Sequence, residues 1–152
     1  MASIIQAIAC PHCSCCATED FYYKMGDKFI WCFRCGYYYE KTQAYYDSEK
    51  NKIYFKENEY IGYGIFRIKK ENDDEAQQTI FHEPLNEEEI HSFTLLMQEE
   101  DVLLEDSYFV LYKNDNFHFI AGSPPEDFYL PFEEYEQKQE ENGKSIMTIL
   151  PL

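Results

Sequence analysis

Two cysteine motifs near the N-terminus decide which fold can be expected: Cys10-Pro11-His12-Cys13 and Trp31-Cys32-Phe33-Arg34-Cys35-Gly36-Tyr37. Each contains a Cys-x-x-Cys pair, and 18 residues separate the two pairs. Zinc prefers four tetrahedral ligands, and each Cys-x-x-Cys turn supplies two thiolates from one tight stretch of backbone. The spacing lies in the range typical of zinc sites. The sequence therefore predicts one zinc ion bound by Cys10, Cys13, Cys32 and Cys35.

The second motif places Gly36 directly after its last cysteine, where the chain must turn sharply. With Cys10–Cys13 as the first knuckle and Cys32–Gly36 as the second, residues 8–40 resemble the zinc-ribbon superfamily. The resemblance implies a structural zinc ion in a small β-ribbon. It leaves the function open, because ribbons of this kind occur in transcription factors, ribosomal proteins, enzyme appendages and partner-binding modules. Ser14 follows the first knuckle where the commonest pattern has glycine.

A second pairing of cysteines competes with the first. Cys13-Ser14-Cys15-Cys16 is itself a Cys-x-x-Cys motif, so Cys16 is an alternative ligand that would leave Cys10 out of the shell. In the favoured pairing, Cys15 and Cys16 are bystanders, and His12 points away from the metal. Four thiolates close the coordination shell, so we expect a structural zinc rather than a catalytic one.

Charge is distributed unevenly along the 152 residues. The net charge is −16, and all of it belongs to residues 43–152, because residues 1–42 contain four basic and four acidic groups. The acidic part would repel a phosphate backbone, which disfavours binding to nucleic acid.

The cysteines also indicate a compartment. All six lie within the first 35 residues, and the first ten residues contain neither a basic group nor an apolar run long enough for a signal peptide or a membrane span. Cysteines in this arrangement suit a metal site in a reducing environment. We therefore expect a cytoplasmic protein with no membrane segment.

Strand and helix patterns predict an α+β fold. Aromatic and β-branched runs flank a turn at Gly26-Asp27, and a second hairpin is expected from residues 108–112 and 117–120. Asn86 and Glu89 form a capping-box pattern before an apolar stripe, which predicts one main helix over about 86–98. We expect a zinc ribbon at 1–42 packed on a mostly antiparallel sheet within an acidic domain at 43–152. Residues 133–142 predict either a solvated helix or a flexible arm.

Aromatic residues are dense around the second knuckle, and they indicate a contact surface. The favoured interpretation is that they dock the ribbon onto the rest of the chain. The other interpretation is a surface for partner binding, for which the candidates are Trp31, Tyr37 and Tyr39. No catalytic motif is present. His82, His91 and His118 are interpreted as surface or core histidines, so we do not expect an enzyme.

Together these patterns predict a small zinc-binding accessory or regulatory protein that acts through contacts with a protein partner. Two alternatives stay open. One is a nucleic-acid-binding zinc ribbon with a role in transcription or RNA metabolism. The other is an acidic inhibitor or immunity-type protein for a basic partner, because complementary charge speeds encounter and selects partners.

Overall fold

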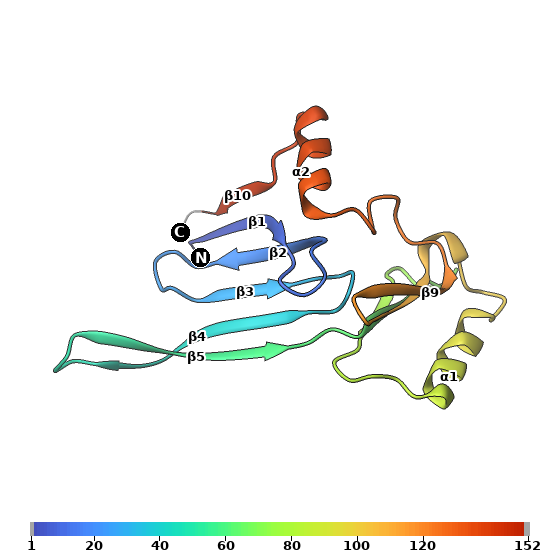
Figure 1. Ribbon diagram of the computed structural model, residues 1–152, viewed down its shortest axis with the longest axis horizontal. Coiled ribbons are helices and arrows are strands. Elements are labelled where there is room, and N and C mark those ends of the chain that lie inside the picture. The colour runs from blue at the N-terminus through green and yellow to red at the C-terminus, as the bar shows by residue number, and fades with distance from the viewer. Residues whose placement is uncertain (1, 151–152) are drawn as a thin grey trace. The chain divides into compact units, whose positions relative to one another are not determined.

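The computed structural model, which describes residues 2–150, contains two antiparallel sheets and two short helices (Figure 1). In spatial order, the six-stranded sheet contains β10 (Met147–Leu150), β1 (Ser3–Ala9), β2 (Cys16–Phe21), β3 (Lys28–Trp31), β4 (Tyr38–Asp47) and β5 (Lys52–Tyr60). The four-stranded sheet contains β7 (Gln77–Ile80), β6 (Gly64–Ile68), β8 (Tyr108–Lys113) and β9 (Asn116–Gly122). The helices are α1 (Glu87–Met97) and α2 (Phe132–Glu141), with a short 3-10 turn η1 (Leu104–Asp106).

The predicted α+β class is wrong, because the described chain is mostly β. The expected main helix forms as α1, but it has only 11 residues, of which Met97 alone is buried. Helix α2 buries none of its residues. The prediction missed how far the six-stranded sheet extends. Strands β4 and β5 continue it on one side of the β2–β3 hairpin, and β1 and β10 continue it on the other.

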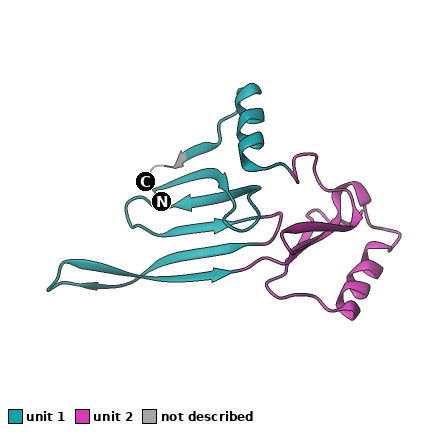
Figure 2. Cartoon of the chain, in the orientation of Figure 1, with its two compact units in different colours: residues 1–32, 37–60, 130–152 teal, residues 33–36, 61–129 magenta. Residues whose placement is uncertain are grey.

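The chain divides into two compact units, shown in different colours in Figure 2. Unit 1 comprises Met1–Cys32, Tyr37–Tyr60 and Leu130–Leu152, and unit 2 comprises Phe33–Gly36 and Ile61–Tyr129. The domain boundary expected at residue 42 stays a prediction, and that residue lies within β4.

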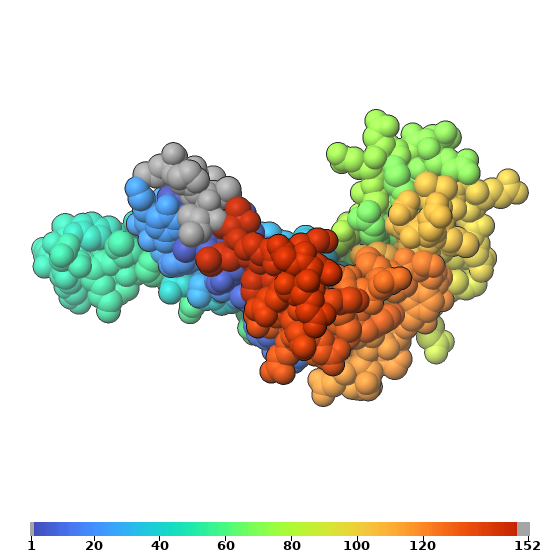
Figure 3. Space-filling view, turned by 90° about the horizontal axis from the view of Figure 1, so that it is seen from above, coloured from blue at the N-terminus to red at the C-terminus, as the bar shows by residue number. Residues whose placement is uncertain are grey.

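Unit 1 is built around the six-stranded sheet. The turn predicted at Gly26-Asp27 joins β2 to β3: the Tyr22 amide donates to the Asp27 carbonyl at 2.8 Å, and Gly26 has a φ of 84°. Strands β4 and β5 continue past the last β3–β4 pair, Lys28 with Lys41, as a two-stranded hairpin. The tip of this hairpin stands clear of the other strands of unit 1 (Figures 1 and 3). Residues 133–142, left open between helix and arm, form most of α2.

Unit 2 is held together by apolar residues on both faces of β8. Phe109 and Leu111 belong to one buried cluster with Phe66, and Phe93 of α1 packs against it with its ring 4.8 Å from that of Phe66. On the other face, Tyr108 and Val110 cluster with Ile65 and Phe128. The nearly continuous apolar run of β8 is thus covered on both faces, as expected of a strand that is apolar on both sides.

Helix α1 begins where the sequence predicts. The Asn86 side chain accepts a hydrogen bond from the Glu89 amide at 2.8 Å, and the Glu89 carboxylate accepts one from the Asn86 amide at 3.3 Å. Both hydrogen bonds of a capping box are therefore present.

No helix in the described part of the chain is long and apolar enough to cross a bilayer.

Candidate metal centre

Four cysteine sulfurs converge at the ends of strands β1 and β3. The Sγ atoms of Cys10, Cys13, Cys32 and Cys35 all lie within 4.8 Å of one another. Cys13 Sγ and Cys32 Sγ are 3.7 Å apart. That distance is far too long for a disulfide, which requires about 2.05 Å. It matches the edge of a tetrahedron with zinc–sulfur bonds of about 2.3 Å, which is about 3.8 Å. The cluster therefore has the dimensions of a four-thiolate metal site.

Burial of the sulfurs supports the same interpretation. Cys10, Cys32 and Cys35 are at most 3% exposed, and Cys13 is half-buried. Among the described residues this is the one group of three or more cysteine, histidine or acidic side chains whose ligand atoms come together. The site predicted from the two Cys-x-x-Cys motifs is thus assembled by the fold.

The first knuckle is a tight turn that directs backbone amides at one sulfur. The amides of His12 and Cys13 lie 3.4 and 3.5 Å from Cys10 Sγ, and the Ser14 amide donates to the Cys10 carbonyl at 3.0 Å. Amides in these positions stabilise a metal-bound thiolate. Ser14 has a φ of 68°, so it adopts the left-handed conformation that glycine takes more easily. The departure from the usual glycine therefore leaves the turn intact and adds backbone strain.

The second knuckle uses a glycine at the equivalent position. The Cys32 amide donates to the Tyr37 carbonyl at 2.9 Å, which closes the loop between β3 and β4. Gly36 has a φ of 96°, and a Cβ atom there would lie 2.9 Å from Ile80 Cγ2 and 3.0 Å from the Gly64 carbonyl oxygen. Both the backbone conformation at residue 36 and the lack of space for a side chain therefore require glycine. The Gly64 amide also donates to the Cys35 carbonyl at 2.8 Å, which fixes the ligand's backbone.

Arg34 anchors the same loop through its side chain. Its Nε donates to the Phe128 carbonyl at 3.0 Å, and its guanidinium lies 3.7 Å from the Asp127 carboxylate. No pattern in the sequence indicated this anchoring role for Arg34. These bonds hold the loop between Cys32 and Cys35 in place.

The remaining cysteines and His12 lie beside the cluster. Cys15 and Cys16 are buried, but neither belongs to the group of converging sulfurs in the described residues. Cys16 Sγ lies 3.8 Å from the Ala17 carbonyl oxygen. His12 is not a member either, and its ring stacks on that of Tyr37 with centroids 6.3 Å apart. The pairing through Cys10 and Cys13 is the one that the fold assembles.

Tyr37 is a neighbour of the site that sequence reasoning treated only as a contact candidate. It is 4% exposed, and its hydroxyl donates to the Glu59 carboxylate at 2.6 Å. Burial, followed by this hydrogen bond and the nearby Glu59 and Cys10 charges, raises the pKa of Tyr37 far above the usual range. An aromatic residue directly after the knuckle glycine was the signal that could have placed it beside the sulfurs.

The other contact candidates, Trp31 and Tyr39, are half-buried. The Tyr39 hydroxyl donates to the Glu57 carboxylate at 2.5 Å. Partial burial and that hydrogen bond raise the pKa of Tyr39 to about 12. Partner binding by Trp31, Tyr37 and Tyr39 stays a prediction, although little of Tyr37 is accessible.

The three histidines of the acidic region do not form a site. The Nε2 atom of His82 lies 3.0 Å from the Gly36 carbonyl oxygen, whereas His91 and His118 are exposed.

Comparison with known proteins finds no matching family model, no matching curated protein and no matching solved structure. The four-cysteine cluster is therefore the feature from which function must be argued.

Proposed function

We propose that this chain is a small zinc-binding protein whose zinc is structural, and that it acts through contacts with another protein. The observation that supports zinc is the convergence of four cysteine sulfurs within 4.8 Å. Thiolates in tetrahedral sets select zinc among the divalent metals common in cells, with iron as the main competitor. Four thiolates leave no open coordination position, so the proposal assigns the metal no catalytic step.

The position of the cysteines explains what a bound metal would stabilise. Cys10 and Cys13 follow β1, whereas Cys32 follows β3, so one ion would join two loops that are distant in sequence. Binding energy of a structural zinc is folding energy, since the unfolded chain has no preformed site. The thiolates must stay reduced to bind zinc, which is why the proposal places the protein in the cytoplasm.

The tip of the β4–β5 hairpin supports the second half of the proposal. Tyr45, Tyr46 and Ile53 are 58%, 51% and 40% exposed there, and the ring of Tyr45 stacks on that of Tyr54 with centroids 4.6 Å apart. Exposed tyrosines are common anchors of protein interfaces, because they provide a large rigid surface at a small cost in side-chain entropy.

Charge at the hairpin tip differs from charge elsewhere. Residues 41–56 contain four lysines and two acidic residues, whereas the whole chain carries −16. The strands extend about 17 Å beyond the last pair with β3, which is longer than the screening length of about 8 Å at physiological salt. At the tip itself, Lys50 and Lys52 balance Asp47 and Glu49, so the tip is a separate, neutral surface that does not repel a protein partner of either charge.

Elemental analysis of the purified chain tests the metal. We expect one zinc per chain, and loss of that zinc in Cys13→Ser. Cys15→Ser is the matched control, because Cys15 is a neighbouring buried cysteine outside the cluster. Zinc retained by Cys13→Ser, or a chain that folds with no metal, would contradict the proposal.

Comparison of two purified forms tests the contact surface. A protein captured by the wild-type chain should bind it directly when both are purified, and should bind at least tenfold more weakly to the double variant Tyr45→Ser, Tyr46→Ser. Equal binding by the two forms would contradict a role for the hairpin. Salt-sensitive binding of single-stranded RNA in place of protein would instead support the nucleic-acid alternative.

A further inference from the structure

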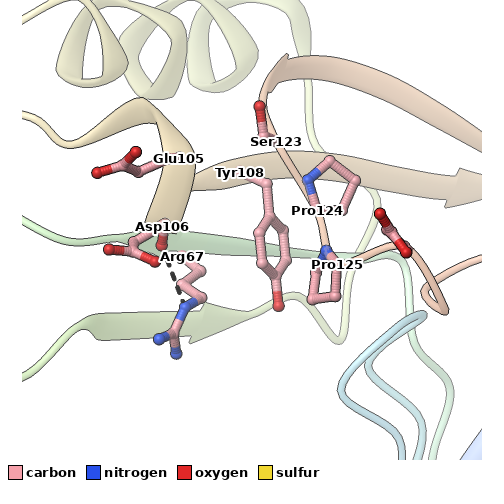
Figure 4. A pocket seen from close by; sticks show the side chains of 8 residues that line it. Arg67, Glu105, Asp106, Tyr108, Ser123, Pro124 and Pro125 are labelled. Carbon is pink, nitrogen blue, oxygen red and sulfur yellow. Dashed lines mark hydrogen bonds between the residues drawn. The ribbon is translucent and has the colours of Figure 1, made fainter.

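A cavity in unit 2, far in sequence from the cysteines, has the properties of a small-molecule site (Figure 4). Its volume is about 460 Å³. It is lined by Arg67, Glu105, Asp106, Tyr108, Ser123, Pro124, Pro125 and Glu126. The lining therefore combines one guanidinium, three carboxylates, two hydroxyls and two proline rings.

Sheet register places the central residues of this cavity side by side. Arg67 of β6 pairs with Tyr108 of β8, and Tyr108 pairs with Gly122 of β9. Residues directly opposite each other on neighbouring strands point to the same face. Arg67 and Tyr108 thus share one face of the sheet, and Gly122 lies beside the tyrosine on the next strand.

The walls of the cavity are fixed by short contacts. A Cβ atom on Gly122, which has a φ of 87°, would lie 2.0 Å from the Ser107 carbonyl oxygen, so the backbone permits only glycine. The Ser123 amide donates to that same oxygen at 2.8 Å, and the buried Ser107 hydroxyl accepts from the Lys69 amide at 2.8 Å. A ligand would therefore enter a preformed site, which lowers the entropy lost on binding.

Two hydrogen-bond donors in the cavity have unused capacity. Tyr108 is 7% exposed and its ring packs on Phe128, yet its hydroxyl, which points into the cavity in Figure 4, has no hydrogen-bond partner among residues 2–150. Arg67 donates from Nε to the Asp106 carbonyl at 3.2 Å, and in the described chain its terminal nitrogens form no ion pair. Both donor groups are open to solvent, so an acceptor supplied from outside the chain can reach them.

The acceptor that best matches these two donors is an anionic oxygen pair. A guanidinium only donates and matches a planar carboxylate. Burial raises the pKa of Tyr108, although the nearby Arg67 and Arg34 charges oppose this, so the phenol is protonated and can also donate at neutral pH. A carboxylate placed against these two groups would satisfy both of them.

The three carboxylates of the lining restrict the ligand further. Glu105, Asp106 and Glu126 outnumber the single guanidinium, so the lining carries a net charge of −2. A simple anion would be repelled, whereas a ligand that also bears an ammonium group would be attracted. Pro124 and Pro125 add an apolar wall. We propose that this cavity binds a zwitterionic amino acid with an apolar side chain, its carboxylate on Arg67 and Tyr108 and its ammonium on Glu126.

This assignment goes beyond the zinc site and does not depend on it. Calorimetric titration of the full-length, zinc-loaded chain tests it with three probes: L-leucine, N-acetyl-L-leucine, which lacks the ammonium, and L-leucine methyl ester, which lacks the carboxylate. We expect L-leucine to bind, and each modified form to bind at least tenfold more weakly, because each loses a charged hydrogen-bonding group.

Two tyrosine variants locate the binding. Tyr108→Phe keeps the ring on Phe128 and removes the hydroxyl, and it should weaken L-leucine binding at least tenfold. Tyr112→Phe is the control, since Tyr112 is equally buried on the same strand but does not line the cavity. Equal affinity of Tyr108→Phe and wild type, equal affinity for the free amino acid and either modified form, or no heat with any probe would overturn the proposal.

Discussion

The two units of this protein bury different kinds of side chain. In unit 2, most buried side chains are large and apolar, with Cys35 and Ser107 as exceptions, and Phe109, Phe128, Ile65 and Val110 are almost completely enclosed. In the described part of unit 1, the buried residues are mostly small or are cysteines: Ala2, Ser3, Cys10, Cys15, Cys16, Ala17, Ile30, Cys32 and Tyr37. Each large apolar side chain contributes about 1.5–3 kcal/mol when buried. Unit 2 can therefore rely on its apolar core, whereas the described part of unit 1 buries few large apolar side chains.

Removal of a zinc ligand is the strongest test of this difference. Cys32→Ser should abolish zinc binding. It should therefore remove most of the metal's contribution to the folding free energy, which reaches about 10–16 kcal/mol in small zinc domains. Hydrogen exchange should then become fast at the amides of β2 and β3, while β6 and β8 keep their protection. A chelator should produce the same pattern in the wild-type chain. Equal loss of protection in both units would show that their stabilities are not separate.

The converse test removes a core side chain from unit 2. Phe109→Ala should cost about 3–5 kcal/mol, because a fully enclosed ring leaves a cavity. Urea unfolding should measure this loss, and hydrogen exchange should locate it in β6, β8 and β9, while β1 and β2 keep their protection. Phe119→Ala is the control, because that ring is 47% exposed on β9. An equal loss of protection in β1 and β2 would contradict the comparison.

The two knuckles provide a smaller and more local comparison. Gly36→Ala should destabilise the chain by at least about 1–2 kcal/mol, because its positive φ is unfavourable for alanine and the added Cβ is crowded. Ser14→Gly should act in the opposite direction by up to about 1 kcal/mol, since it relieves a left-handed residue. Thermal unfolding of the zinc-loaded variants measures both. A stabilising Gly36→Ala would refute the required backbone geometry.

The smallest expected effect is a dependence on alkaline pH within unit 1. Partial burial and the hydrogen bond to Glu57 raise the pKa of Tyr39 from 10.0 to about 12 in the folded chain. The folded state therefore favours the protonated phenol, so this contribution is present below pH 10 and is lost as the pH rises to about 12. Tyr39→Phe should reduce the fall in unfolding free energy between these values. Tyr45→Phe, at an exposed position, serves as the control.

Local patterns in the sequence predicted local structure well. Both hairpin turns, the capped start of α1 and the four converging cysteines depend on residues close in sequence or on fixed ligand chemistry. The fold class was wrong because it depends on distant pairings. Strand β1 joins β10 across more than 130 residues, and the apolar run Ile4-Ile5 alone does not specify a partner.

The candidate sites follow the same rule. The convergence of the four cysteines was predictable because their spacing and the chemistry of metal binding restrict it. The cavity of unit 2 was not, because Arg67, Tyr108 and Gly122 come together only through the register of three strands. In the sequence, Tyr108 looks like any other aromatic residue of a buried strand. The local sequence pattern does not indicate that its hydroxyl lacks a hydrogen-bond partner.

The pairing of β1 with β10 has a consequence for the order in which the protein is made. Unit 2 lies between these strands in sequence, so the ribosome synthesises all of Ile61–Tyr129 before β10 emerges. During that interval β1 is paired on one side only, with β2. An unpaired strand edge is a template for association between chains. Nascent chains of this protein are therefore most prone to association after unit 2 has emerged and before residues 147–150 follow.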